Sequence, residues 1–290
     1  MKNTLKVHIY SAITILIWGC GFPFTRAIGD EIGPYALAFE RCFLAAIILI
    51  ILGKFTGLRK PFEKKDLLWF FLSGFFGFSA YSVFYNMGLA TLDSATGCMI
   101  TAIGPILTAI AVLKLYNEKI NKTGWITMVT AFIGVGILLM WGNGLNISIG
   151  ALWMFLCAIC FTGYSVLTRR FTKQGYTAME VVTYSVIFAA IQLIFFLPAA
   201  VSDISHASLV SNLAAIYMGV MTSAAAYYTW SKALELTDNT STVTNYLYVN
   251  PLVAAVVGFI LLNEIPGPGF YIGGAITLIS VIIFSLKGNN

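Results

Sequence analysis

Long apolar segments separated by short polar ones are the feature that most limits how this chain can fold. A helix needs about 20 mainly apolar residues to cross the hydrocarbon core of a bilayer, whereas a transmembrane β-barrel alternates polar and apolar residues over roughly ten positions per strand. Ten segments have the length of spanning helices: residues 8–28, 34–53, 67–89, 92–115, 123–142, 148–168, 178–199, 209–233, 239–262 and 268–287. The sequence therefore predicts an all-α integral membrane protein with ten transmembrane helices.

The residue composition excludes an ordinary soluble domain. Hydrophobic residues make up 59% of the chain and charged residues 10%, whereas soluble domains have roughly 45–50% and about 25%. All five cysteines lie inside apolar segments, and Cys157 and Cys160 are interpreted as small buried residues rather than a redox pair. We expect the lipid bilayer as a partner, and we expect neither a cofactor, a metal nor a nucleic acid.

The basic residues predict which side of the membrane each loop faces, because cytoplasmic loops carry an excess of Lys and Arg. With the N-terminus inside, 15 of the 17 basic residues fall on the cytoplasmic side, and only Arg26 and Arg41 do not. The 15 are Lys2, Lys6, Lys54, Arg59, Lys60, Lys64, Lys65, Lys114, Lys119, Lys122, Arg169, Arg170, Lys173, Lys232 and Lys287. The predicted external loops carry Asp30, Glu31, Asp93, Asp203 and Glu264. Both termini are therefore predicted to be cytoplasmic, in a bacterial cytoplasmic membrane.

A shift of 146 residues aligns the two halves of the chain. Residues 104–118 and 250–264 then share five identities in fifteen positions. The identities are Pro105 with Pro251, Ala109 with Ala255, Leu115 with Leu261, Asn117 with Asn263 and Glu118 with Glu264. Each copy holds five predicted helices, an odd number, so the copies lie in opposite orientations, an arrangement found in secondary transporters. The predicted repeats are residues 1–145 and 146–290.

Four stretches carry a resemblance to a known family: IWGCGFPFTRAI at 17–28, FERCFLAAI at 39–47, GPILTAIAVLKLYNEKI at 104–120 and NPLVAAVVGFILLNEIP at 250–266. With the ten spans and the five-helix repeat, the chain resembles the drug/metabolite transporter superfamily, in its EamA-type branch, over essentially its whole length. The resemblance implies two inverted five-helix bundles around a central cavity. It also implies transport of small organic metabolites, often as export, without fixing the substrate.

Two charged residues lie inside the second predicted span. Glu40 and Arg41 are adjacent, so their side chains point about 100° apart on a helix. Arg41 is interpreted as a structural residue that pairs with a carboxylate or carbonyl of a neighbouring helix, and the family resemblance implies the same role. Glu40 is the candidate for proton coupling or for binding a cationic group. The alternative for Glu40 is a partner role toward Arg26 or the surroundings of Arg41.

Aromatic and amide side chains inside the spans predict a substrate pathway. Most of them recur three or four positions apart, which places each pair on one face of a helix. The candidates are Trp18, Phe22, Tyr81, Tyr85, Asn86, Thr101, Tyr164, Tyr227, Trp230, Asn245 and Tyr248. A cavity lined by such groups suits a flat or cationic metabolite. The alternative is that these aromatics only pack helices together.

The two matched prolines and the two Asn-Glu pairs are interpreted as landmarks of the repeat. Pro105 and Pro251 lie near the middle of their spans, where a missing hydrogen bond allows a kink or hinge. Glu118 and Glu264 lie at the membrane boundary just before the next helix, whose positive N-terminus favours a carboxylate. The pairs are predicted to form helical hairpins, and a further role in gating stays open.

Several function classes have no motif to support them. The chain lacks the nucleotide-binding GxxxxGK[ST] sequence and the catalytic HExxH and GxSxG sequences, so no catalytic residue is expected and the chain is not predicted to be an enzyme. We expect a secondary-active transporter of a small metabolite, such as an amino acid or an amphipathic or cationic compound. A channel-like or structural membrane protein is the alternative, and proton coupling and a homodimer stay open.

Overall fold

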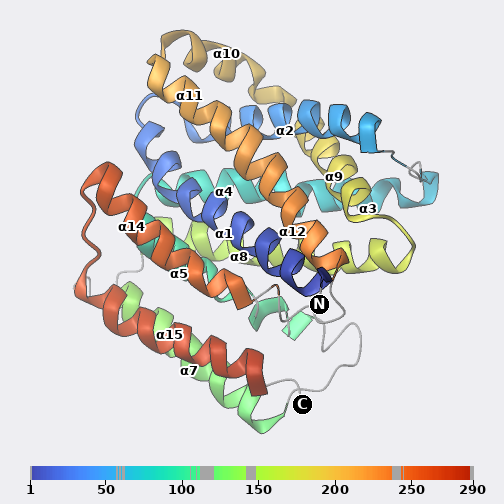
Figure 1. Cartoon of the computed structure of the whole chain (residues 1–290). Coiled ribbons are helices and arrows are strands. Elements are labelled where there is room, and N and C mark those ends of the chain that lie inside the picture. The colour runs from blue at the N-terminus through green and yellow to red at the C-terminus, as the bar shows by residue number, and fades with distance from the viewer. Residues whose placement is uncertain are drawn as a thin grey trace.

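Helices form all the regular structure in the part of the chain that the computed structural model describes: residues 2–56, 58, 60, 63–104, 106–108, 110–111, 121–141, 148–236, 243 and 245–287 (Figure 1). The α-helices are α1 (Lys2–Ile28), α2 (Pro34–Thr56), α3 (Leu67–Gly74), α4 (Ala80–Leu89), α5 (Ser94–Thr101), α7 (Lys122–Met140), α8 (Ile149–Lys173), α9 (Ala178–Gln192), α10 (Leu197–His206), α11 (Leu209–Tyr217), α12 (Ala226–Glu235), α14 (Asn250–Leu262) and α15 (Pro268–Lys287). Short 3-10 segments are η1 (Lys64–Asp66), η3 (Ile194–Phe196) and η5 (Asn245–Val249), and π-helical segments are η2 (Phe75–Ser79) and η4 (Met218–Ala225). The predicted landmarks Pro105 and Glu118 lie outside the described residues.

Within the described residues, five helical segments are long and apolar enough to cross a membrane: Leu5–Ile28, Pro34–Phe55, Lys64–Leu89, Ile149–Lys173 and Leu209–Ala233. The bent pair Ala178–Gln192 and Ile194–His206 makes a sixth if it counts as one span. Shorter apolar helices occupy Ser94–Thr108, Lys122–Leu138, Tyr246–Leu262 and Pro268–Phe284. The all-α prediction is confirmed and the chain passes the membrane several times, while the count of ten spans stays a prediction.

Two helices leave the α-helical pattern at positions that the 146-residue shift relates. The segment η2 interrupts the helix between α3 and α4, and η4 interrupts the helix between α11 and α12. The shift carries Phe75–Ser79 onto 221–225, which lie inside η4. Short π-helical segments are rare in proteins, and those that occur are often found at functional sites. The two repeats therefore share an unusual backbone feature at one position.

The span predicted at 178–199 is not one straight helix. α9 ends at Gln192, and α10 continues at an angle of 51° after the 3-10 turn η3. Pro198 lies in the first turn of α10. Because proline lacks an N–H and its ring clashes with the carbonyl four residues earlier, Pro198 favours a kink or break near Ile194. The helical residues continue past the predicted end at residue 199 to His206, and the assignment of both helices to one span stays a prediction.

The helix contacts occur in pairs that the repeat relates. The shift exchanges α1 with α8, α2 with α9, α4 with α12 and α7 with α15. Accordingly, α1 packs against α12, and α8 packs against α4. Likewise α2 contacts η4 while α9 contacts η2, and α2 packs against its own counterpart α9. This exchange is what two copies of one bundle related by a pseudo-twofold axis would produce.

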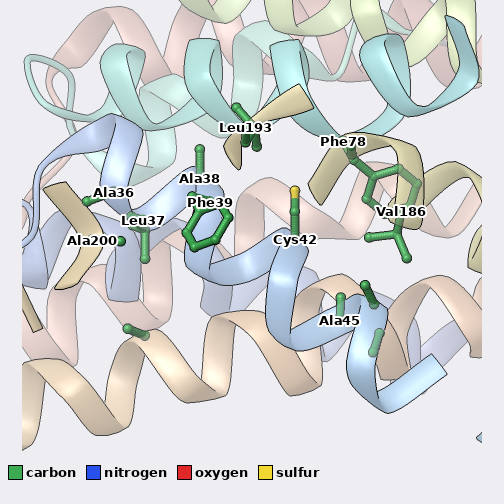
Figure 2. Packing of buried hydrophobic residues seen from close by; sticks show 14 of the residues in the cluster. Ala36, Leu37, Ala38, Phe39, Cys42, Ala45, Phe78, Val186, Leu193 and Ala200 are labelled. Atoms are coloured by element: carbon green, nitrogen blue, oxygen red, sulfur yellow. The ribbon is translucent and has the colours of Figure 1, made fainter. Parts of the chain in front are cut away.

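Helix α2 lies at the centre of the largest apolar cluster. Its residues Leu37, Phe39 and Cys42 are at most 3% exposed. Figure 2 shows Cys42 pointing toward the space between Leu193 and Phe78, with Val186 beside Phe78, and it shows Leu37 next to Ala200. Burial of this surface holds α2 and α9, the two counterpart helices, together.

Helices α7 and α15 form a separate pair along one edge of the molecule (Figure 1). A β-carbon added to Gly134 would lie 2.8 Å from the Gly273 carbonyl oxygen, so the two backbones meet directly at this point. Small residues allow such close approach between membrane helices. The pair therefore needs glycine at these two positions.

Four of the predicted external loops share one end of the bundle, which we call the Arg26 end: residues 26–33, 89–94, 203–208 and 264. The Glu31 carboxylate accepts hydrogen bonds from the Ser208 N–H at 2.5 Å and its hydroxyl at 3.1 Å. These bonds hold the pKa of the Glu31 carboxyl below its ordinary value of 4.5. The Asp203 carboxylate accepts from the Gly33 N–H at 2.9 Å. Which end of the bundle faces the cytoplasm stays a prediction.

Candidate functional site

A cavity of about 60 Å³ lies among helices that come from both repeats. Its walls belong to α1, α2, α4, α5, α8, η4, η5 and α14 and to the break that follows α5. The lining residues are Trp18, Gly21, Phe22, Arg41, Tyr81, Tyr85, Cys98, Thr101, Ala102, Gly104, Ala158, Phe161, Thr222, Leu247 and Asn250. The cavity wall therefore brings together five of the predicted pathway residues: Trp18, Phe22, Tyr81, Tyr85 and Thr101.

Two broken helices meet at this cavity. α5 ends at Thr101, and Gly104 follows on the cavity wall. On the other side, η5 contributes Leu247 and the first residue of α14 is Asn250. The 146-residue shift carries Thr101 onto Leu247 and Gly104 onto Asn250. Discontinuous helices at a repeat interface form the substrate sites of many secondary transporters, so the cavity lies where such a site is expected.

Aromatic rings make up much of the wall. The Phe22 and Tyr85 rings lie 4.9 Å apart between centroids, and Tyr81 stacks on Tyr85 at 5.8 Å. Phe161 of α8 approaches Tyr81 at 6.0 Å and Trp18 edge-on at 6.2 Å. These distances fall within the range of favourable ring contacts. The rings support one another and present apolar faces around the cavity.

Trp18 and Tyr227 bind the two π-helical segments. The Trp18 indole N–H donates to the Thr222 carbonyl oxygen in η4 at 3.0 Å, and the Tyr227 hydroxyl donates to the Gly77 carbonyl oxygen in η2 at 3.0 Å. Their rings are also 5.2 Å apart. Each segment thus has a backbone carbonyl held by an aromatic donor from a different helix, which gives Trp18 a structural role beside its place on the wall.

Arg41 projects into the cavity wall, where the sequence did not place it. The side chain is 4% exposed, and its guanidinium carbon lies 5.1 Å from the centroid of the Tyr85 ring. Nε donates to the Ser223 hydroxyl at 3.3 Å and Nη1 donates to the Asn86 amide oxygen at 3.4 Å. Arg41 therefore ties α2 to η4 and α4, as a structural residue would, and also brings a positive charge to the cavity.

Glu40 lies away from the cavity wall. Its side chain is 6% exposed, and Oε1 has no hydrogen-bond partner among the described residues. The contacts of Arg41 described above are with Ser223, Asn86 and Tyr85 rather than with Glu40, in agreement with the prediction that the two neighbours occupy different faces. A role of Glu40 in proton coupling stays a prediction.

Three further predicted aromatics lie behind the wall. The Trp230 ring packs 5.3 Å from Trp18, and the Tyr164 ring lies 5.8 Å from Tyr227 and 5.6 Å from Phe78. Trp230, Tyr164 and Tyr227 are each at most 6% exposed. They are absent from the cavity lining in the described residues, and they support the residues that form it.

The remaining candidates occupy other places. Asn86 donates to the Pro34 carbonyl oxygen at 2.8 Å while accepting from Arg41, so it positions the guanidinium. Tyr248 packs in the cluster that includes Ile106 and Phe284. Only the backbone of Asn245, in η5, is described. The cavity therefore does not bring Asn245 and Tyr248 together with the other candidates within the described part of the chain.

Pro251 and Glu264 mark the two ends of α14. Pro251 is in the first turn, where η5 gives way to the α-helix, rather than in the middle of one continuous helix. Asn263 ends α14 with φ of 53°, in the left-handed region that suits asparagine at a helix C-terminus. Glu264 forms an ion pair with Arg26, and its Oε2 accepts from the Ser94 N–H at 3.0 Å.

The ion pair joins three segments at the Arg26 end. Besides Glu264, the Arg26 guanidinium contacts the carbonyl oxygens of Leu89 at 3.1 Å and Leu92 at 2.7 Å. Arg26 belongs to α1, the two carbonyls to the α4–α5 region and Glu264 to the residues after α14. Both side chains are partly buried, at 34% and 13% exposure. These contacts hold the three segments together at the Arg26 end.

Sequence reasoning missed Gly104, Asn250 and Arg41 as cavity residues. For the first two a signal was present, because Gly104 precedes Pro105 and Asn250 precedes Pro251. The residue before a proline is disfavoured in helical conformation, so two matched X-Pro pairs predict two matched breaks. For Arg41 no comparable signal exists, since its face of α2 depends on how α2 packs against η4.

Two stretches of the chain, residues 5–140 and 148–286, each match the model of the EamA-like transporter family. An uncharacterized transporter of Bacillus subtilis (strain 168) is 27% identical over 289 residues, which cover 99% of this chain and 94% of that protein. A probable terminal-alkyne amino-acid exporter of Streptantibioticus cattleyicolor is 27% identical over 275 residues, 95% of this chain and 92% of that protein.

One solved structure has a TM-score of 0.66 to this chain at 18% sequence identity, covering 97% of this chain and 96% of the matched chain. At this identity the likeness shows a shared fold and says nothing of activity. The family domain is present twice, and the fold of the whole chain has an experimentally solved counterpart.

Proposed function

The chain belongs to the EamA-like transporter family, and from this premise we propose that it is a secondary-active carrier of a small organic metabolite. The family consists of transporters rather than enzymes. In our proposal the ten predicted spans form two inverted repeats in the cytoplasmic membrane, and the cavity opens to each side in turn. Export is the expected direction, and the amino-acid exporter among the similar proteins suggests amino acids among the compounds to test.

One observation carries the proposal: the cavity lies where two broken helices meet, and its lining at those breaks consists of residues that the repeat relates. One sequence packed in two equivalent ways supplies two conformations of similar energy, which alternating access requires. The volume of about 60 Å³ is below the roughly 300–1,000 Å³ of typical small-molecule pockets. A substrate therefore needs the helices to separate, as they do in a carrier.

Exchange in proteoliposomes tests the proposal without a known substrate. Vesicles containing the protein are loaded with a metabolite extract, and release of each compound is followed by mass spectrometry with and without the same extract outside. A carrier releases a subset of compounds, saturably, and faster when substrate is present on the other side. Release that never saturates, or single-channel currents, would favour a channel, and release no faster than from protein-free vesicles would leave no transport function.

The same vesicles test proton coupling through Glu40. We expect Glu40→Gln to remove the dependence of exchange on a pH gradient while leaving exchange itself, because Glu40 is buried but lies away from the cavity wall. Exchange with an unchanged pH dependence would remove Glu40 from the mechanism.

A further inference from the structure

Arg41 places a positive charge in a wall whose other side chains, among the described residues, are aromatic, apolar or neutral polar groups. The residue is buried by the surrounding helices, with 4% of its surface exposed. Burying a charge is costly unless the charge is paired and hydrogen-bonded. Arg41 carries this free-energy cost at a position that lines the cavity.

The described residues satisfy this guanidinium only in part. Its hydrogen bonds go to a neutral hydroxyl, Ser223, and a neutral amide, Asn86, at 3.3 and 3.4 Å. Charge-assisted pairs are typically shorter, about 2.7–2.9 Å. The guanidinium has more N–H donors than these two contacts use. Among the described residues no carboxylate lies within ion-pair distance of it.

The rest of the wall suits the apolar part of a ligand. Trp18, Phe22, Tyr81 and Phe161 supply ring faces, and the neutral polar groups of Thr101 and Asn250 lie at the helix breaks. A guanidinium binds a carboxylate through two parallel hydrogen bonds, and aromatic faces bind the ligand's hydrocarbon part. The site therefore has one group for an anion and an apolar surface beside it.

We propose that the cavity binds amphipathic carboxylates, with the ligand carboxylate on Arg41 and its apolar part among the rings of α1, α4 and α8. The proposal rests on the carrier function and names its substrate class. It also replaces the expectation of a cationic metabolite, because a cation in this cavity would face the guanidinium. A zwitterionic amino acid qualifies through its carboxylate, and a simple amine does not.

Ligands matched in shape test the proposal on the unmodified protein. The probes are 3-phenylpropanoate, 3-phenylpropanamide and 3-phenylpropylamine, with phenylalanine and phenylalaninamide as a second pair. Melting temperature is measured against ligand concentration, since a ligand that binds the folded state raises it. We expect each acid to bind at least about tenfold more tightly than its amide, because hydrogen bonds to charged groups contribute that much. Equal binding of acid and amide, tighter binding of the amine, or no binding by either acid would overturn the proposal.

Substitutions then locate the anion site. Arg41→Gln should reduce acid binding to the level of the amide while leaving amide binding unchanged, and Arg41→Lys should keep part of the preference. Arg170→Gln is the matched control, because Arg170 also lies over an aromatic ring, 4.1 Å from Trp69, but not on the cavity. An acid preference that survives Arg41→Gln would overturn the assignment. If that variant fails to fold, the ligand series and Arg41→Lys still decide.

The two proposals fail in different ways. Acid-selective binding without exchange in vesicles would leave the binding site standing and remove the carrier. Saturable exchange restricted to metabolites that carry no carboxylate would leave the carrier standing and remove the carboxylate site.

Discussion

Gly104 lies on the cavity wall just after α5, and a β-carbon added there would meet no atom of the described residues within 4 Å. Its backbone is outside the left-handed region, since the only glycine with positive φ among the described residues is Gly175. Its counterpart Asn250 also precedes a proline and carries a β-carbon. A side chain is therefore sterically accepted at position 104 and would occupy the cavity.

We predict that Gly104→Leu abolishes exchange and ligand binding while changing the melting temperature little, because the isobutyl group fills the space a ligand needs. Gly136→Leu is the control, since a β-carbon at Gly136 also meets nothing within 4 Å but lies on α7, away from the cavity. Exchange by Gly104→Leu at the rate of Gly136→Leu would show that the substrate passes elsewhere.

At the scale of elements, η2 and η4 are π-helical segments that interrupt an α-helix at equivalent positions in the two repeats. Each is bound by an aromatic donor: Trp18 donates to Thr222 in η4 and Tyr227 donates to Gly77 in η2. Because both donors come from helices outside the segment that they bind, they fix how neighbouring helices are oriented around the cavity. Movement of the repeats would have to keep or exchange these contacts.

Tyr227→Phe should lower stability by roughly 1–3 kcal/mol, the usual cost of leaving a buried carbonyl without its donor. The measurement is the melting temperature in detergent. Tyr228→Phe is the neighbouring control, because the Tyr228 hydroxyl has no hydrogen-bond partner within the part of the chain that the structure describes. A melting temperature of Tyr227→Phe equal to that of Tyr228→Phe would mean that the bond to η2 contributes nothing.

The elements differ in how far sequence could predict them. The apolar segments predicted that the chain is helical, and the proline predicted that a helix is interrupted near Pro251. The π-helical segments could not be predicted, since Phe75–Ser79 reads as ordinary apolar helix and only packing decides the local hydrogen bonding. Packing also decides which aromatic residues reach the cavity. Trp18 and Tyr85, which were predicted from their spacing, line it. Tyr248, an aromatic residue predicted in the same way, packs against α7 and α15 instead.

At the scale of the whole molecule, contacts at the Arg26 end join parts of both repeats. Arg26 bonds to Leu89, Leu92 and Glu264, and Glu264 bonds to the N-terminal turn of α5 at Ser94. Opening the cavity toward this end must break the Arg26–Glu264 pair. If the two sides open alternately, weakening this end shifts the population of conformations toward the one open here and away from the other.

The accessibility of Cys98 from the two sides of the membrane tests alternating access most directly. Cys98 lines the cavity at 2% exposure, and it is kept as the single cysteine after alanine replaces Cys20, Cys42, Cys157 and Cys160. An impermeant maleimide is applied to right-side-out and to inverted vesicles, with and without Arg26→Gln. We predict that Arg26→Gln speeds labelling from the side of the Arg26 end and slows it from the other side. Labelling that rises from both sides together, or does not change, would contradict alternating access at this cavity.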